Sequence, residues 1–164
     1  MEKNKDHFIQ ILEAHQGILF KVCNFYCQEK EERQDLMQDI LVQVWSSLGN
    51  FDESVKLSTW VYRIALNVAI SNYRKRKVRG PVESISGTSI LEIPDHEESP
   101  NEKEEMLKVF INELDELNKA LMLMYLDGNS HEEIAMALKL SKSNVGTKIN
   151  RIKSQLKVKF QHHD

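Results

Sequence analysis

The sequence predicts an all-α protein of two small helical domains joined by a flexible linker, the C-terminal one a helix-turn-helix. Apolar residues recur at helical spacing through most of the 164 residues. All three prolines fall in one stretch, 80–100, where they interrupt the helical pattern. The sequence has no alternating apolar pattern of useful length for a β-strand. We therefore divide the chain into a domain at 1–79, a linker at 80–100 and a domain at 101–164.

The N-terminal domain is expected to contain three long helices. They cover roughly residues 6–28, 31–48 and 58–77, and the loop GNFDES separates the second from the third. Each helix carries one apolar stripe that can face a common core. In the third helix this stripe consists of Val61, Ile64, Ala65 and Val68.

The C-terminal domain is expected to contain four helices, and the last two have the pattern of a helix-turn-helix. Ser130 and Ser141 stand at the positions of N-caps, and Glu133 completes a capping box with Ser130. The exposed face of the last helix carries small polar and basic groups that can reach base edges in the major groove. These groups are Lys142, Ser143, Thr147, Lys148, Asn150 and Arg151. An ordinary amphipathic helix pair is the alternative interpretation.

Charge is distributed unevenly along a chain whose net charge is only −3. Residues 56–79 hold seven basic side chains and no acid, and residues 139–159 hold another seven and no acid. Residues 92–116 hold ten acids. A single charged run is often only a solvated helix face. Two basic runs, one in each domain, favour nucleic-acid binding through the release of counterions from phosphates.

With both domains interpreted, the chain resembles the extracytoplasmic-function (ECF) group of RNA polymerase sigma factors in the sigma-70 family. RQDLMQDILVQVW resembles the core-binding helix of that family, and FDESVKLSTWVYRIALNVAISNYRKRK resembles its melting and minus-ten segment. LMLMYLDGNSHEEIAMALKLSKSNVGTKINRIKSQL resembles the minus-35 domain. The resemblance implies an initiation factor that binds core RNA polymerase, directs it to promoters with minus-35 and minus-10 elements, and aids melting.

Two positions depart from the family pattern. Lys139 stands in the turn where many members have glycine, and we take this to mean a different turn conformation. Gly146 stands where a basic residue is common, so one base or phosphate contact is expected to be missing.

The basic run of the N-terminal domain follows a row of aromatic residues that includes Trp60, Tyr62 and Tyr73. Unpaired bases stack on aromatic faces. We expect Trp60 to act as a wedge during melting, with Arg63 and Asn67 on the same helix face. The alternative places Trp60 and Tyr62 in the core. The basic side chains expected to hold the DNA backbone are Arg74, Lys75, Arg76, Lys77 and Arg79.

The resemblance also implies partners and their sites. Asn67 and the loop 51–58 would recognise a flipped non-template base. The apolar segment LNKALMLMY and its neighbours would meet the β-flap of the polymerase, and an anti-sigma factor would control the protein. The residues that would dock on the clamp coiled coil of the β′ subunit are Asp35, Gln38, Asp39 and Trp45.

Enzymatic function is not favoured by any motif in the sequence. We find no P-loop, metal-ligand cluster or nucleophile elbow, so we expect no catalytic residue, metal, cofactor or small-molecule substrate. Cys23 and Cys27 would share a helix face and are interpreted as buried thiols; a metal site would need further ligands, of which only His15 is near. The sequence shows neither a membrane-spanning run nor a secretory signal, so a cytoplasmic location is expected. The alternative function is a stand-alone helix-turn-helix transcriptional regulator.

Overall fold

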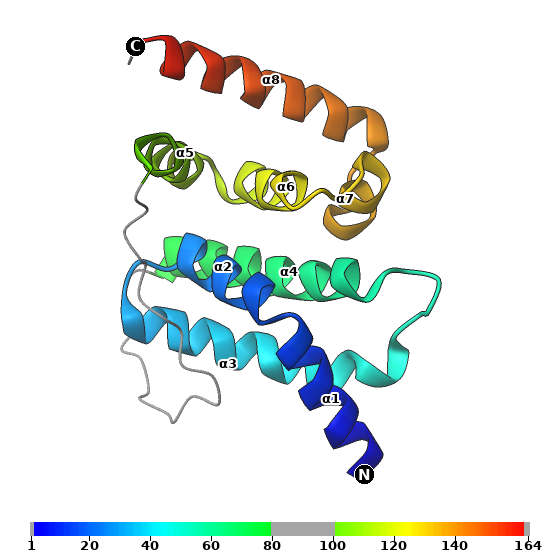
Figure 1. Cartoon of the computed structure of the whole chain (residues 1–164). Coiled ribbons are helices and arrows are strands. Elements are labelled where there is room, and N and C mark those ends of the chain that lie inside the picture. Colours follow the sequence, from blue (N-terminus) through cyan, green and yellow to red (C-terminus); the bar gives the residue numbers. More distant parts are fainter. Residues whose placement is uncertain (1, 80–100, 163–164) are drawn as a thin grey trace. The chain divides into compact units, whose positions relative to one another are not determined.

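The computed structural model describes residues 2–79 and 101–162 as helices and short connections (Figure 1). The chain divides into two units, Met1–Glu97 and Glu98–Asp164. The all-α expectation is confirmed, whereas the expected linker at 80–100 lies outside the described residues. Within the described parts, no helix is both long enough and apolar enough to cross a membrane.

The N-terminal unit contains α1 (Glu2–Ala14), α2 (Gln16–Tyr26), α3 (Lys30–Ser47), the 3₁₀ turn η1 (Leu48–Asn50) and α4 (Leu57–Arg79). Helices α2, α3 and α4 pack side by side and bury one apolar stripe each (Figure 1). The residues with no exposed surface at this centre are Leu19, Val22, Cys23, Met37, Ile40, Val44, Ala65, Leu66 and Ala69. Burial of these stripes supplies the main stabilisation of the unit.

We expected a single first helix. This prediction is wrong, because the helix breaks at His15 into α1 and α2. The backbone of His15 leaves the helical region, with φ −123° and ψ 22°. Its ring Nδ1 lies 2.8 Å from the carbonyl oxygen of Ile11, which also accepts from the His15 amide at 3.1 Å. Gly17, a poor helix former, lies two residues later. Local hydrogen bonding at this position therefore competes with a continuous helix.

The C-terminal unit contains α5 (Glu102–Glu113), α6 (Glu116–Leu126), α7 (His131–Leu138) and α8 (Lys142–Gln161). Helix α6 is its central element, because five consecutive residues, Ala120 to Met124, are buried. A helix that is apolar all round needs neighbours on several sides. Helices α5, α7 and α8 all contact it.

The two N-caps expected for the helix-turn-helix are confirmed. Ser130 Oγ accepts from the amide of Glu133 at 3.1 Å, and Ser141 Oγ accepts from the amide of Asn144 at 3.0 Å. Ser130 Oγ also donates to the Glu133 carboxylate at 3.2 Å. These bonds satisfy amides that the first turn of each helix leaves without a helical partner.

The turn of the helix-turn-helix corrects our expectation for Lys139. Its backbone has φ 57° and ψ 45°, the left-handed conformation, so lysine adopts the geometry that glycine adopts most easily. The amides of Lys139 and Leu140 both turn back to the carbonyl of Ala135. The conformation is therefore imposed by helix termination, at a cost of about 1–2 kcal/mol for a residue with a Cβ.

We predict that Lys139→Gly stabilises the C-terminal unit. Removing the Cβ relieves the left-handed strain, and the greater entropy of glycine in the unfolded chain offsets part of the gain. The expected net increase in the free energy of unfolding is about 0.5–1 kcal/mol. Native-state hydrogen exchange of α7 and α8 amides measures it for this unit alone.

Lys139→Ala is the matched control, because it removes the charge and the long side chain but keeps the Cβ. It is expected to leave the exchange rates of α7 and α8 close to those of the wild type. An equal gain in both variants would show that the side chain, and not the backbone conformation, limits stability.

Candidate nucleic-acid and polymerase interfaces

The acidic face of α3 lies opposite its buried face, as its spacing predicts. Leu36 and Ile40 are buried, while Asp35 and Gln38 are partly exposed and Asp39 is exposed. Asp39 is not isolated, because its Oδ2 accepts a hydrogen bond from Asn72 Nδ2 of α4 at 2.7 Å. The acidic face thus borders α4 along one edge.

Loss of hydration raises the pKa of the Asp35 carboxyl, and the negative charges of Asp39, Glu31 and Glu32 raise it further. Negative charge is therefore concentrated on this face at a cost to the isolated chain. A cationic partner placed against the face would remove that cost. The arrangement suits a basic docking surface.

Apolar side chains extend the acidic face toward the C-terminal end of α3. Val42 is 64% exposed and Trp45 is 46% exposed. The Trp45 ring meets Phe8 of α1 edge-on, with the ring centroids 5.2 Å apart. Exposed apolar groups beside a charged stripe are typical of a protein–protein contact.

A pocket of about 400 Å³ lies between α3 and α4. Arg63 and Asn67 contribute polar groups to it from α4, as their shared helix face predicts. Trp60 contributes a wall, and its ring meets Phe51 edge-on at a centroid distance of 5.1 Å. The lining residues are Gln43, Ser47, Asn50, Trp60, Arg63, Ile64, Asn67 and Val68.

The expected projection of Trp60 from the helix as a wedge is wrong for the free chain. Trp60 is only 8% exposed, because its ring packs inward beside Phe51 and Ile64. Tyr62 is 1% exposed, so the core interpretation holds for it too. Val68, expected in the core, is only half-buried. A large ring beside an apolar core is stabilised more by burial than by exposure.

Gln43 and Ser47 are pocket residues that we did not foresee from the sequence. They continue the row that begins at Asp35 and Asp39, at a spacing of four residues along α3. Gln43 Nε2 donates to Ser47 Oγ at 3.3 Å. The four-residue spacing and the polar residue types could have indicated from the sequence that Gln43 and Ser47 lie on the same face of α3 as Asp35 and Asp39.

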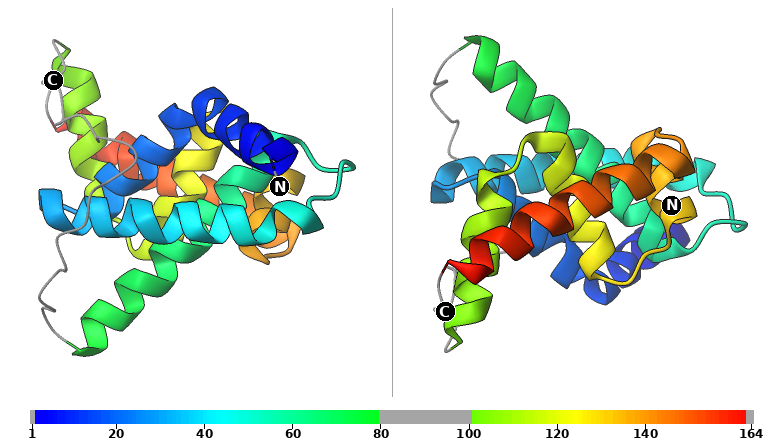
Figure 2. Two further views of the ribbon diagram at one scale, coloured as in Figure 1. Left: turned by 90° about the horizontal axis from the view of Figure 1, so that it is seen from below. Right: turned by 90° about the horizontal axis from the view of Figure 1, so that it is seen from above.

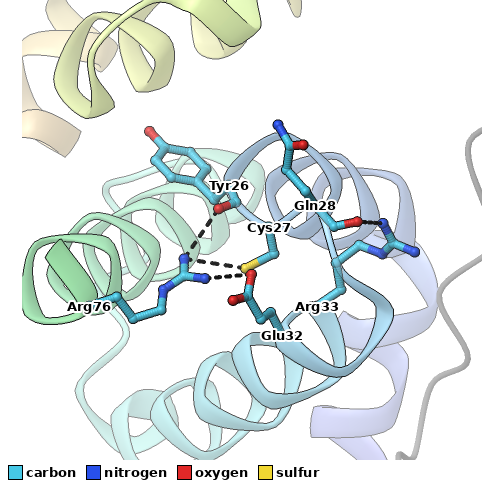
Figure 3. Close-up of polar contacts among 6 residues, drawn as sticks. All are labelled: Tyr26, Cys27, Gln28, Glu32, Arg33 and Arg76. Atoms are coloured by element: carbon cyan, nitrogen blue, oxygen red, sulfur yellow. Dashed lines mark hydrogen bonds and ion pairs between the residues drawn. The ribbon is translucent and has the colours of Figure 1, made fainter. Parts of the chain in front are cut away.

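The basic end of α4 is only partly available to a ligand. Arg74, Lys75 and Lys77 are exposed. Arg76, which we expected to hold the DNA backbone, instead contacts Glu32 and the end of α2 (Figure 3). Its side chain is engaged within the N-terminal unit.

Helix α8 buries Val145, Ile149 and Ile152 and exposes the opposite face, as predicted. Lys142 forms an ion pair with Glu132 of α7 at 3.0 Å, and Thr147 Oγ1 donates to the carbonyl of Ser143 at 3.0 Å. Among the residues expected to read the minus-35 element, Lys148 is half-exposed and the others are exposed. These residues are Lys142, Ser143, Thr147, Lys148, Asn150 and Arg151.

The apolar segment LNKALMLMY forms most of α6 and is largely buried, so this helix itself offers little docking surface. Its neighbours α5 and α8 instead form a groove of about 530 Å³. Met106, Val109 and Phe160 supply apolar lining, and Phe110 lies beneath Lys159, which is paired with Glu113. The groove is an apolar surface with charged side chains at its edge.

Cys23 and Cys27 are buried, as expected, and both are free thiols. Burial raises the pKa of each thiol, so both stay protonated and unreactive. The His15 ring, the nearby alternative metal ligand, bonds to the carbonyl of Ile11.

Comparison with protein families assigns both units. Residues 11–79 match the sigma-70 region 2 family, and residues 104–156 match sigma-70 region 4. A stand-alone helix-turn-helix regulator would leave the region 2 match without an explanation. The two matches follow one another in the order that the sequence motifs predict.

Curated relatives agree along most of the chain. The ECF RNA polymerase sigma factor SigW of Bacillus subtilis is 25% identical over 94% of this chain and 89% of its own length. The ECF RNA polymerase sigma-E factor of Escherichia coli is 32% identical over 77% of this chain and 73% of its own length.

Solved structures share the fold. The sigma factor RpoE from Bartonella quintana, in complex with the anti-sigma factor NepR, has a TM-score of 0.68 at 19% identity and covers 98% of both chains. CnrH, in complex with the cytosolic domain of CnrY, has a TM-score of 0.67 at 22% identity, over 98% of this chain and 91% of CnrH.

Members of this family bind core RNA polymerase and promoter DNA. They are initiation factors that catalyse no reaction themselves. The two domain matches and the sigma-E relative together show that this chain belongs to the ECF sigma factors of the sigma-70 family, which direct RNA polymerase to promoters.

Proposed function

We propose that residues 1–79 bind core polymerase and open the minus-ten element, and that residues 101–164 bind the minus-35 element, with 80–100 as the linker between them. The matches to regions 2 and 4 support this division. The protein would act in the bacterial cytoplasm, where polymerase and chromosome are found. The observation that carries the proposal is a pocket of about 400 Å³, lined by Trp60, Arg63 and Asn67, on the same helix that ends in exposed basic side chains.

The pocket between α3 and α4 is the proposed receptor for a flipped non-template base of the minus-ten element. Asn67 and Arg63 offer hydrogen-bonding groups at its edge, and the Trp60 wall offers an aromatic surface. Stacking on an aromatic ring is worth about 1–3 kcal/mol per base, comparable with the cost of unstacking it. Trp60 thus contributes within the pocket and not as a projecting wedge. Lys75 and Lys77, two to three turns farther along α4, would hold phosphates farther along the strand.

The acidic face of α3 is the proposed contact with the clamp coiled coil of the β′ subunit. Its carboxylates repel one another in the free chain, so a basic partner surface gains more here than at an isolated acid. Val42 and Trp45 would add apolar contact at the C-terminal end of this interface. The residues assigned to this contact are Asp35, Gln38, Asp39 and Trp45.

The exposed face of α8 is the proposed reader of the minus-35 element in the major groove. Asn150 and Arg151 have the chemistry to read adenine and guanine edges, respectively. The apolar groove between α5 and α8 is the proposed site for the β-flap. Lys157, exposed farther along α8, would contact phosphate.

An anti-sigma factor is the proposed regulator. The RpoE structure described above contains the anti-sigma factor NepR, and the CnrH structure contains the cytosolic domain of CnrY. In this chain the acidic face and the α5–α8 groove are exposed, so an inhibitor that covers them would prevent binding to core polymerase.

We predict that Asn67→Ala impairs promoter opening but not closed-complex formation. Lysine and arginine contacts with phosphate, which supply most closed-complex affinity, are untouched. Loss of one contact with a base costs about 1–3 kcal/mol, or about a 5- to 150-fold decrease in opening. Permanganate footprinting of unpaired thymines on a duplex promoter measures opening, and a pre-melted bubble should restore it.

Asn112→Ala, an exposed asparagine substitution in α5, is the matched control. Equal opening by wild type and Asn67→Ala on the duplex promoter would remove Asn67 from the proposed base site.

We predict that Asp35→Asn stabilises the free protein at pH 7 and weakens core binding by about ten-fold or more. The folded state raises the pKa of Asp35 above its unfolded value, so the ionised carboxylate lowers stability above that pKa. As the pH falls through the pKa of Asp35 in the folded protein toward its pKa in the unfolded chain, Asp35 takes up a proton. The difference in melting temperature between the wild type and Asp35→Asn then disappears. Thermal melts across pH and titration with core polymerase measure the two effects.

Glu13→Gln removes one exposed acid from α1 and controls for net charge. If Asp35→Asn binds core polymerase as tightly as Glu13→Gln does, the acidic face is not the core contact.

We predict that Asn150→Ala and Lys157→Ala weaken promoter binding in different ways. Asn150→Ala should cost about 1–3 kcal/mol and relax preference at one minus-35 position. Lys157→Ala should weaken all promoters alike and reduce the slope of log K against log[salt] by about one. Affinity measurements on a promoter set at several salt concentrations separate them. An unchanged base preference in Asn150→Ala would show that Asn150 is not a reader.

A further inference from the structure

The end of α4 that carries the basic side chains is not fixed by an apolar core. Along the described length of this helix, burial ends at Ile70. In both views of Figure 2 the C-terminal end of α4 diverges from α3. A helix end that buries no apolar face and carries several like charges has little intrinsic stability in water. Polar contacts must therefore define where this end points.

Arg76 makes such contacts with two other helices (Figure 3). Its Nη1 lies 2.8 Å from Glu32 Oε2 of α3. Its Nη2 donates to the carbonyl of Tyr26 at 3.2 Å and lies 3.5 Å from Cys27 Sγ. The Arg76 and Glu32 side chains are 30% and 40% exposed, so water screens this pair only in part. We call these four residues, Tyr26, Cys27, Glu32 and Arg76, the Arg76 junction.

Each partner in the junction is suited to a guanidinium group. Tyr26 is the last residue of α2, so its carbonyl lies at the negative end of the helix dipole. Glu32 lies in the first turn of α3, where a carboxylate is favoured. Arg33 fixes the corner between these helices by donating to the carbonyl of Gln28 at 2.9 Å. Arginine alone supplies donors in several directions from one rigid plane.

A second polar contact lies one turn earlier on α4. Asn72 donates to Asp39 of α3 at 2.7 Å. Asn72 and Arg76 are one turn apart on α4, and their partners Asp39 and Glu32 are two turns apart on α3 in the reverse order. These two contacts set the register of the antiparallel helices beyond the end of the apolar core.

We propose that Arg76 is a positioning residue for promoter binding and makes no contact with DNA itself. The Arg76 junction holds the end of α4 so that Arg74, Lys75 and Lys77, which lie around the side of the helix away from Arg76, are presented to the phosphates together. This inference rests on the proposed function of α4 in binding the minus-ten region. According to this inference Glu32 favours binding to promoter DNA, although Glu32 and DNA are both negatively charged, because Glu32 holds Arg76 in place.

Glu32→Gln distinguishes positioning from direct contact by the sign of its effect. If Arg76 held a phosphate, removing its acidic partner would free the guanidinium and strengthen promoter binding. If Arg76 positions the helix end, the same substitution loosens the junction and weakens binding. We expect roughly three- to ten-fold lower promoter affinity and a shallower salt slope, equivalent to about one lost phosphate contact.

The experiment measures promoter affinity against salt for holoenzyme assembled at saturating core polymerase, so that any change in core binding does not affect the result. Arg76→Gln should match Glu32→Gln, and the double variant should be no weaker than either, because both remove one shared contact. Hydrogen exchange should accelerate in residues 71–79 and stay unchanged in the buried part of α4. Glu29→Gln, an exposed acid at the N-cap of α3 three positions away, is the control and should leave affinity unchanged or slightly higher.

Lys77→Gln tests the proposed function separately. If Lys77→Gln weakens promoter binding but Glu32→Gln strengthens it or leaves it unchanged, Arg76 is not a positioning residue and the role of α4 stands. Opposite, additive effects of Arg76→Gln and Glu32→Gln would overturn the inference in the same way. If Lys77→Gln has no effect, the basic end of α4 does not contact promoter DNA, and both proposals are wrong.

Discussion

The antiparallel packing of α3 against α4 is the constraint on which the N-terminal unit depends. The buried stripes of these helices fix their distance, and the contacts Asp39–Asn72 and Glu32–Arg76 fix their register. Because of this register, acids lie at one end of the shared edge and the polar pocket at the other. If one helix shifted along the other by a single turn, Asn67 and Gln43 would no longer line the same pocket.

One helix therefore takes part in two kinds of recognition. The outer face of α3 presents carboxylates and Trp45 to a protein partner, while its edge supplies Gln43 and Ser47 to the pocket beside α4. Helix α3 also packs directly against α4, so the proposed polymerase contact and the proposed promoter contact belong to one packed pair of helices.

The helix caps were predictable from the sequence, whereas contacts with distant partners and the helix terminations at His15 and Lys139 were not. Ser130 and Ser141 cap helices only a few residues away, so residue type and spacing sufficed. A tryptophan at position 60 could either project as a wedge or pack in the core. Which of the two occurs depends on its contact with Phe51 in the preceding loop. The partner of Arg76 is Glu32, on a different helix and far away in sequence. The left-handed turn at Lys139 was missed because residue type alone suggested another conformation, whereas the termination of α7 determines it.

The different surroundings of the two tryptophans give the protein a built-in optical reporter. Trp45 is nearly half exposed on the acidic face, whereas Trp60 is enclosed beside the pocket. These are the only tryptophans in the sequence, and both belong to the N-terminal unit. Emission at longer wavelength that is quenched by iodide therefore comes from Trp45, and the shorter-wavelength, protected component comes from Trp60. One unlabelled sample can thus show separately when the outer face of α3 is covered and when the pocket changes its contents.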